Sequence, residues 1–274
     1  MATYGRKVEI DTFLKSIEQQ QYDISKIEII IIDQNDTLVL DDICEAHSAR
    51  LNIKHIKSDK KGLSYNRNIG LRVAIGEIVA FPDDDCTYYP ETLTEIENYF
   101  NDYNNVDVVL GKIYDRKIKK NIIRNWKDFV YKISINNFFL SFSSITIFAK
   151  KNDIFFDNDL GVGSFFGSNE DGDYILQHLN ENKIVYYSPS IEVWHPDFSS
   201  SVLSDGKVYS YGLGFGALVK KHLSVPLVFL FFQSLFFHIF KLILAIFCLN
   251  RYEIKKRYLS VTSRVKGFYL YDSK

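Results

Sequence analysis

The range Glu77–Tyr89 constrains the fold most, because a strand-sized apolar run ends there in three consecutive carboxylates. Residues 78–81 read Ile-Val-Ala-Phe and have the length of one buried strand. Pro82 ends this strand, since proline has no N–H group to donate to a neighbouring strand. The aspartates at 83–85 then follow at the carboxyl end of the strand, which is where open α/β sheets bind their ligands.

Two interpretations of these aspartates stay open on this stretch alone. Three adjacent acids without a basic neighbour repel one another unless a cation is present, and their hard oxygen atoms suit Mg²⁺ or Mn²⁺, which take phosphate oxygens as further ligands. Alternatively, the acids form a solvated loop before a helix, because Pro90 fits the first helical position and Glu91 follows it. The first interpretation predicts a metal–diphosphate site, whereas the second predicts only a helix start.

The spacing of apolar residues predicts an α/β fold for the first 110 residues. Strands are expected at 28–32, 53–57, 77–81 and 106–110, with helices at 8–21, 38–49, 62–75 and 90–103. The continuous apolar run at 28–32 is typical of a strand that is buried on both faces. Because strands that alternate with helices form parallel sheets with right-handed crossovers, we expect a mixed, mainly parallel sheet with flanking helices.

The pattern beyond residue 112 is less regular. Helices are expected at 126–135 and 170–180, short strands at 143–149, 184–187 and 191–194, and a glycine-rich loop at 159–167. The helix at 170–180 begins with acids, which favour a helix N-terminus.

The composition bounds the class and the compartment of the protein. A chain of 274 residues with 46% hydrophobic and 24% charged residues is ordinary for a globular protein of one large or two small domains. Cys44, Cys86 and Cys248 are odd in number and widely spaced, without a zinc or disulfide pattern, so we expect a reducing compartment. The first ten residues contain no apolar signal region, and we expect no export.

The last quarter of the chain is basic and apolar. Residues 206–274 contain eleven Lys or Arg and two Asp or Glu, although the net charge of the chain is −1. The range 225–249 is apolar and long enough to span a bilayer, but Gln233, His238 and Lys241 interrupt it and basic residues flank it on both sides. Because this charge pattern fits a simple span poorly, we expect a segment that lies in the cytoplasmic leaflet rather than a nucleic-acid contact. The alternative is a buried core helix.

Four stretches together resemble family two of the inverting glycosyltransferases, which have the GT-A fold. They are ATYGR at 2–6, EIIIIDQND at 28–36, KGLSYNRNIGLRVAIGEIVAFPDDDC at 61–86 and GVGSFFGSNEDGDYILQHL at 161–179. Each stretch alone is a weak signal, but four such stretches in the order of the family rarely occur together by chance. The resemblance implies a Rossmann-like GT-A fold and sugar transfer from a nucleotide donor.

The resemblance assigns roles to the acids after the third predicted strand. Asp83 and Asp85 are implied metal ligands, and Asp84 is implied to lie toward the ribose or the metal. His195, in the sequence VWHP, matches a metal-bound histidine of some relatives, although a loop histidine before a turn proline is an equal alternative. A Mn²⁺ or Mg²⁺ ion there would neutralise charge on the leaving nucleoside diphosphate.

The pair Glu170 and Asp171 matches the ED motif of the family. Inversion needs a carboxylate that takes the proton from the acceptor hydroxyl while the hydroxyl attacks the anomeric carbon. The resemblance implies that Asp171 is this base and that Glu170 orients the acceptor. The alternative is that both acids only stabilise a helix N-terminus.

The implied nucleotide-binding residues come from two strand ends. Thr3 and Tyr4 match the end of the first strand of the family, and Asp33 and Gln34 match the end of the second. Many relatives have two aspartates at the second position, so Gln34 leaves the choice of nucleotide open.

The N-terminal part of the chain departs from the family in one further respect. Only Met1 and Ala2 precede Thr3, so the first strand is expected to be nearly missing.

Lys61 and Arg67 lie where the family has basic residues near the diphosphate, although surface charges at a helix start are an equal alternative.

The sequence therefore predicts a membrane-associated, metal-dependent hexosyltransferase. Residues 1–222 are expected to form the catalytic domain and 223–274 a membrane-associating segment. The expected partners are a nucleotide sugar, a polyprenyl-diphosphate-linked saccharide and the cytoplasmic face of the plasma membrane, without nucleic acid. One alternative is a metal-dependent nucleotidyltransferase, but such enzymes usually have a glycine-rich phosphate loop, and none is visible in this sequence. The other alternative is a non-catalytic membrane scaffold. The presence of all five acids, at 83–85, 170 and 171, argues against a scaffold without a catalytic site.

Overall fold

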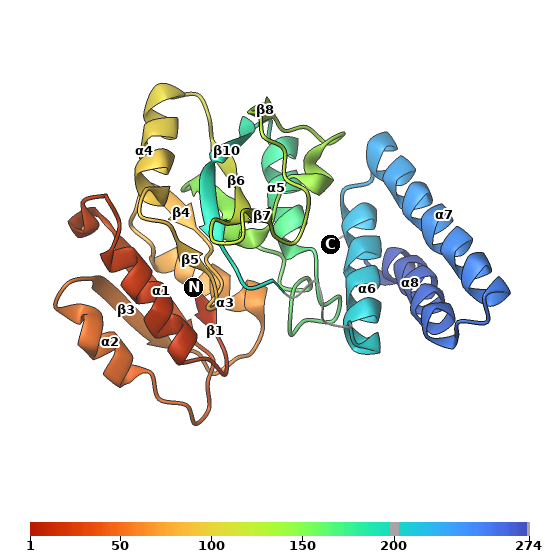
Figure 1. Ribbon diagram of the computed structural model, residues 1–274, viewed down its shortest axis with the longest axis horizontal. Helices are drawn as coiled ribbons and strands as arrows, with labels where there is room; N and C mark the ends of the chain where they lie inside the picture. The colour runs from red at the N-terminus through yellow and green to blue at the C-terminus, as the bar shows by residue number, and fades with distance from the viewer. Residues whose placement is uncertain (198–202, 273–274) are drawn as a thin grey trace. The chain divides into compact units, whose positions relative to one another are not determined.

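The computed structural model describes residues 1–197 and 203–272 (Figure 1). The chain divides into two compact units, and helix α5 (Glu170–Asn180) belongs to both. Unit 1 consists of Met1–Lys61, Tyr65–Phe155 and Gln177–Ser200, and unit 2 consists of Gly62–Ser64, Phe156–Leu176 and Ser201–Lys274.

A three-stranded parallel sheet forms the N-terminal part of unit 1. Its order is β1 (Ala2–Thr3), β2 (Glu28–Asp33) and β3 (Asn52–Lys57). The isoleucines of β2 build its core, and Ile31 and Ile32 are fully buried, as expected for a strand covered on both faces. The predicted loss of most of the first strand is confirmed, because β1 has only two residues.

A second, seven-stranded sheet of unit 1 is mostly antiparallel. Its order is β4 (Ile78–Ala80), β9 (Ile147–Lys150), β6 (Val108–Asp115), β10 (Val185–Trp194) and β5 (Thr87–Tyr88), with β7 (Lys120–Asn121) on β6 and β8 (Tyr131–Lys132) on β10. Only β6 and β10 pair in parallel. The prediction of a mainly parallel sheet is therefore wrong for this sheet, because its antiparallel strands come from the irregular middle of the sequence. The two strands predicted at 184–187 and 191–194 are one strand with a register shift.

The helices of the predicted α/β alternation are all present, with shorter bounds. They are α1 (Val8–Glu18), α2 (Asp41–Ser48), α3 (Leu63–Val73) and α4 (Thr92–Asp102). Helix α1 buries Ile10, Phe13 and Leu14 on its apolar face. Pro90 is not the first residue of α4, since the helix begins at Thr92 after the N-cap residue Glu91.

The helix predicted at 126–135 does not form. The indole of Trp126 stacks on the ring of Tyr187 with centroids 6.3 Å apart, and its Nε1–H donates to the carbonyl of Ile122. Tyr131 and Lys132 instead form β8 against β10. The apolar spacing resembles that of a helix, but these side chains pack on a sheet. The predicted strand at 143–149 is likewise shorter, because residues 144–146 form a 3₁₀ turn before β9.

Buried His47 ties α2 to α1 and should make unit 1 sensitive to pH. Its ring nitrogens lie 2.8 Å from Glu18 Oε1 and 3.0 Å from Asp11 Oδ1. Burial alone would lower the pKa of His47, but the hydrogen bonds to both carboxylates outweigh burial and raise it. The stabilisation is therefore complete below the unfolded-state pKa of about 6.5 and is lost as the pH rises through the folded-state pKa.

We expect His47→Gln to lower the stability of unit 1 by about 1–2 kcal/mol at pH 6 and by less at pH 9. Hydrogen exchange of the amides of α1 and α2 at both pH values measures the effect. A loss of protection that is equal at pH 6 and pH 9 would contradict a charged His47 in the folded state.

Unit 2 contains the C-terminal helices α6 (Asp205–Lys221), α7 (Val225–Phe247) and α8 (Arg251–Leu270), of which α8 packs on both others (Figure 1). Glycines allow α6 and α8 to lie very close together. A Cβ atom at Gly216 would overlap the carbonyl oxygen of Arg264, and a Cβ atom at Gly267 would overlap the carbonyl oxygen of Leu213. Even alanine is excluded at both positions.

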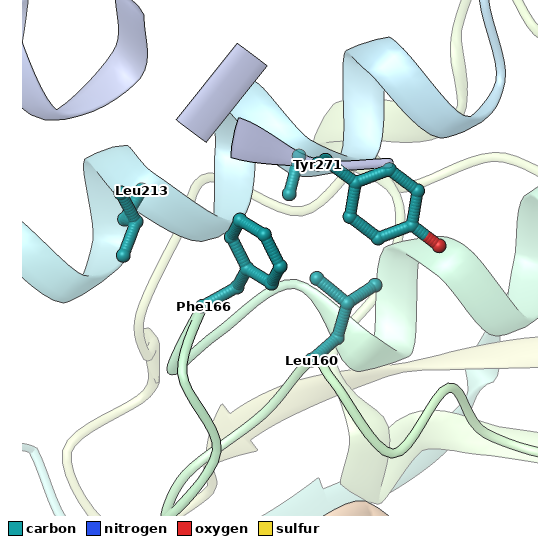
Figure 2. Packing of buried hydrophobic residues seen from close by; sticks show 5 residues of the cluster. Leu160, Phe166, Leu213 and Tyr271 are labelled. Atoms are coloured by element: carbon teal, nitrogen blue, oxygen red, sulfur yellow. The ribbon is translucent and has the colours of Figure 1, made fainter. Parts of the chain in front are cut away.

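A small apolar cluster joins the end of the chain to the rest of unit 2. Figure 2 shows Leu160 and Phe166 of the glycine-rich loop packed with Leu213 of α6 and with Tyr271, which follows α8; Ala217 completes the cluster. Deletion of residues 223–274 would therefore expose buried side chains, in addition to removing the apolar helix.

Helix α7 is the one candidate for a membrane span within residues 1–197 and 203–272. It has 23 residues with a mean hydropathy of 2.1, and only 11% of its most apolar window is buried. The alternative of a buried core helix is wrong, because phenylalanines such as Phe229, Phe236 and Phe247 are 63–81% exposed.

Candidate active site

The loop after β4 places the three aspartates against the N-terminal segment of unit 1. The Thr3 hydroxyl donates a 2.8 Å hydrogen bond to Asp84 Oδ2. Arg6 bridges two of the acids, with its Nε 3.1 Å from Asp84 Oδ1 and its Nη2 2.9 Å from Asp85 Oδ2. Thr3 therefore lies against the acidic loop, and its role in nucleotide binding stays a prediction.

Two further side chains reach the aspartates. Arg67 Nη2 lies 2.8 Å from Asp83 Oδ1, and His195 Nε2 lies 3.4 Å from Asp85 Oδ1. The three aspartates have no basic neighbour in the sequence, but in the folded chain Arg6 and Arg67 pair with them. The expectation that they repel one another without a cation is therefore wrong. Arg6 is the candidate residue that sequence reasoning missed, although it ends the ATYGR stretch that carried part of the resemblance.

Asp83, Asp85 and His195 are positioned to hold a divalent cation together. One potential ligand atom from each lies within 4.8 Å of the others. The His195 Nδ1–H donates to the Pro196 carbonyl at 2.8 Å, which directs Nε2 toward the carboxylates, as in many metal-binding histidines. Two carboxylates and one imidazole suit Mn²⁺ or Mg²⁺. The residues thus fit the metal that the sequence predicted, and their ligand roles stay predictions.

The environment gives neighbouring acids opposite pKa shifts. Burial raises the pKa of Asp84, against the hydrogen bond from Thr3 and the charge of Arg6. Burial would also raise the pKa of Asp85, but the hydrogen bond and charge of His195 and the charge of Arg6 outweigh it and lower the pKa. Asp85 is therefore the more firmly ionised of the two, as a metal ligand must be.

The predicted nucleotide-binding residues at the end of the second strand, Asp33 and Gln34, are both buried. Asp33 is fully buried at the end of β2, 2.5 Å from Lys57 Nζ and 3.0 Å from His55 Nε2. Burial would raise the pKa of Asp33, but the Lys57 and Asn35 hydrogen bonds lower it. Gln34 is 7% exposed. Sequence reasoning missed His55 and Lys57, although their alternation on β3 places both beside the end of β2.

The two predicted diphosphate-binding cations have different environments. Arg67 is only 5% exposed and pairs with Asp83, so the surface-charge alternative is wrong for Arg67. Lys61 is half exposed, pairs with Asp36 and lies 3.2 Å from the hydroxyl of Tyr4. Tyr4 itself is 56% exposed, which leaves its ring accessible to a flat ligand such as a nucleobase.

The ED pair opens helix α5 in unit 2, as predicted. Glu170 is buried, and Asp171 is half-buried with its Oδ1 accepting the Gly172 N–H at 2.8 Å. Burial and the charges of Glu170 and Asp171 raise the pKa of Tyr211, which lies on α6. The pair therefore lies in unit 2 while the aspartates of the loop after β4 lie in unit 1.

A buried ionic network anchors the first turn of α5. Asp173 is fully buried, 2.8 Å from Lys221 Nζ and 2.7 Å from His222 Nε2 at the end of α6. Lys221 also lies 2.8 Å from Asp157, which accepts a hydrogen bond from the Tyr271 hydroxyl at 2.6 Å. Sequence reasoning did not single out any of these residues, because the partners are far apart in the chain: Asp173 and His222 are 49 positions apart, and Asp157 and Tyr271 are 114 positions apart.

We expect Lys221→Met to destabilise unit 2 by about 3 kcal/mol, because it removes the ammonium group that pairs with the carboxylates of Asp157 and buried Asp173. Tyr271→Phe removes one hydrogen bond to a carboxylate and should cost about 1.5 kcal/mol. Lys220→Met, one position earlier, is the matched control and should change stability by less than about 0.5 kcal/mol. Thermal unfolding of the three variants checks the order, and equal effects of Lys221→Met and Lys220→Met would contradict it.

The family of the chain follows from comparison with known sequences. The profile described as "Glycosyl transferase family 2" matches residues 1–167, which is more than half of the chain. The chain therefore belongs to glycosyl transferase family 2, an inverting GT-A family, as the sequence resemblance indicated.

Two relatives of known description are similar to this chain. It is 24% identical over 189 residues to the poly(ribitol-phosphate) β-N-acetylglucosaminyltransferase TarP of Staphylococcus aureus, covering 67% of this chain and 57% of TarP. It is 26% identical over 226 residues to TarS of the same species, an enzyme with the same description, covering 76% of this chain and 37% of TarS. The chain thus spans only part of both relatives.

Solved structures show the same fold. Residues 1–349 of TarS in complex with UDP-GlcNAc match with a TM-score of 0.56 and 21% identity, over 81% of this chain and 70% of that chain. The mannosyltransferase PcManGT from Pyrobaculum calidifontis, in complex with GDP-Man and Mn²⁺, matches with a TM-score of 0.55 and 15% identity, over 97% of this chain and 72% of that chain. At these identities the structures establish a mixed α/β, GT-A-like fold.

Proposed function

We propose that this protein is an inverting hexosyltransferase that moves a sugar from a nucleoside-diphosphate sugar to a lipid-linked saccharide in the assembly of a cell-surface polysaccharide. The observation that carries the proposal is the cluster of Asp83 and Asp85, which follow β4, with His195, which follows β10, in a chain of this family. The cluster has the ligand chemistry for a cation that accompanies a diphosphate.

The residues of unit 1 act on the donor. Asp83, Asp85 and His195 hold Mn²⁺ or Mg²⁺, and the bound ion supplies a Lewis acid for the leaving diphosphate. Arg67 lies beside this cluster and contributes a second positive charge near the phosphates. Thr3 fixes the orientation of Asp84 toward the ribose.

The base of the nucleotide is held by the residues at the ends of β1 and β2. The exposed ring of Tyr4 offers a stacking surface, and Asp33 and Gln34 lie at the end of β2. The relatives were solved with UDP-GlcNAc and with GDP-Man, so both uracil and guanine donors belong in the first test.

Asp171 removes the proton from the acceptor hydroxyl, and Glu170 orients the acceptor. The hydrogen bond from the Gly172 N–H occupies Oδ1 of Asp171, which fixes the carboxylate. A fixed carboxylate on a rigid helix start suits a general base, because the base must meet the hydroxyl in one geometry.

Incubation of purified protein and Mn²⁺ with a panel of UDP-, dTDP- and GDP-sugars tests the proposal. We expect slow release of nucleoside diphosphate from one donor, and faster release with an acceptor. Prenyl-diphosphate saccharides and poly(ribitol phosphate), the polymer named in the descriptions of TarP and TarS, are the acceptors to compare. The absence of hydrolysis with every donor would contradict the proposed reaction. A preference for poly(ribitol phosphate) would contradict the proposed acceptor.

The proposed location is the cytoplasmic face of the plasma membrane, with residues 1–222 as the catalytic part and 223–274 as the attachment. Helix α7 exposes apolar side chains over its whole length, and Lys220 and Arg251 lie close to its two ends. A helix of this kind binds in the interface through apolar burial and attraction to anionic lipid, at about 1 kcal/mol per basic residue.

We expect Lys274→Cys to stay unlabelled by an impermeant maleimide in intact cells and to react after lysis. Lys274 lies outside the described residues. Cys44 and Cys86 are buried, so only the exposed Cys248 has to be replaced, and the Cys248→Ser protein is the matched control. Labelling from outside would show that α7 crosses the bilayer and that the in-plane arrangement is wrong.

A further inference from the structure

An apolar cavity of about 250 Å³ lies among the three C-terminal helices of unit 2. Its lining comes from α6 (Val219), α7 (Val228, Phe231 and Phe232) and α8 (Val265, Phe268 and Tyr269). Val219 and Phe231 are buried and form the floor, whereas Phe232 and Tyr269 are more than 60% exposed and form the rim. The cavity is therefore open to the surroundings of the helices.

The rim of this cavity carries positive charge. The Lys220 ammonium lies 5.5 Å from the centroid of the Phe268 ring, which lines the cavity. Lys266, next to Val265 in the sequence, is exposed, but its ammonium lies 5.7 Å from the ring centroid of Tyr209, which does not line the cavity, so Lys220 is the cation at the rim. An apolar floor with a cation at its opening complements a ligand that has a hydrocarbon chain and an anionic head.

We propose that this cavity binds the hydrocarbon chain of a polyprenyl phosphate lipid, with Lys220 beside its phosphate. The identity of the chain rests on the proposed function, in which such a lipid carries the acceptor saccharide. The site itself rests on the cavity and its rim, and on the apolar face of α7, which continues from Phe232 to Phe236 and Phe240 with each side chain at least 50% exposed. Binding would hold the carrier lipid on unit 2, the unit that contains Asp171.

Photo-crosslinking of the full-length protein in neutral detergent micelles tests this site. The probe is a polyprenyl phosphate with a diazirine in its chain, and the labelled peptides are mapped by mass spectrometry. We expect saturable labelling in the peptides that contain Val228–Phe232 and Val265–Tyr269. Unlabelled polyprenyl phosphate should compete, whereas phosphatidylglycerol should not.

Val228→Trp fills the cavity and should reduce this labelling at least about tenfold, which corresponds to about 1.4 kcal/mol. Val225→Trp makes the same change at a position that is 84% exposed and outside the lining, so it should leave labelling unchanged. Lys220→Glu leaves the cavity intact. It should weaken labelling by polyprenyl phosphate about fivefold, but not labelling by an uncharged polyprenol probe.

Three results would overturn the inference. They are labelling spread evenly along α7, equal competition by phosphatidylglycerol, and equal labelling of the Val225→Trp and Val228→Trp proteins. Donor hydrolysis, measured on the same preparations, separates the two proposals. Hydrolysis without saturable labelling removes only the lipid site, whereas a lack of hydrolysis with every donor removes the proposed function.

Discussion

Asp171→Asn is expected to lower sugar transfer roughly 10²–10⁴-fold, with donor affinity unchanged. The substitution keeps the size of the side chain and removes only its ability to accept a proton. Because other side chains are the predicted ligands of the nucleotide and the metal, binding of the nucleotide should not depend on this carboxylate. Turnover with a saccharide acceptor and calorimetric titration with the nucleoside diphosphate measure the two effects separately.

A control is needed because Asp171 is also an acid at a helix start, where carboxylates stabilise the helix by about 0.3–1 kcal/mol. Glu95→Gln removes a carboxylate from the first turn of α4 in the same way, and it should leave turnover near that of the unchanged protein. If folded Asp171→Asn protein turns over normally with the correct acceptor, Asp171 is not the base.

Asp85→Asn is the second change with a large expected effect. It removes one of three potential ligands from the cluster and should lower metal-dependent turnover by about 10²-fold or more, because a metal Lewis acid contributes several kcal/mol to the transition state. Asp59→Asn, at an exposed acid of unit 1, is the control.

Calorimetry of UDP, dTDP and GDP in Mn²⁺ and in EDTA gives an independent measurement. The nucleotide that binds in Mn²⁺ should bind at least about tenfold more weakly in EDTA and to Asp85→Asn protein. The two nearby arginines make this a stringent test, since Arg6 and Arg67 already offset the charge of the acids. Equal affinity in Mn²⁺ and EDTA would leave these side chains as the charge partners of the diphosphate and contradict a metal role.

The sequence predicts best where local pattern and tertiary environment agree. Helix α5 was predicted with the bounds that the structure shows, because acids at Glu170–Asp173 favour a helix start and apolar residues follow at helical spacing. The strand before the aspartates was also predicted, because a short apolar run that ends at a proline is typical of a buried strand. Five candidate site residues belong to these two elements: the aspartates at 83–85 directly follow the strand, and Glu170 and Asp171 begin the helix.

The parts that failed depend on partners far away in the chain. Nothing local distinguishes the segment at 126–135 from a helix, and only the surface of β10 makes its aromatic residues pack as they do. Arg6 was missed because its partners are almost 80 positions away, and Lys221 because its buried acid is on another element. Charge pairs of this kind cannot be read from spacing along one strand or helix.

The glycine contacts between α6 and α8 bear on how proteins of this kind can be recombined. A chimera that joined the catalytic part of this chain to the attachment helices of a relative at residue 222 would keep Gly212 and Gly216 on α6 but lose the matching surface of Ser263 and Gly267 on α8. A new α8 with ordinary side chains would stand away from α6, and the cluster of Leu160, Phe166 and Leu213 would lose the ring of Tyr271. Exchange should therefore succeed only when α6, α7 and α8 are transplanted as one block.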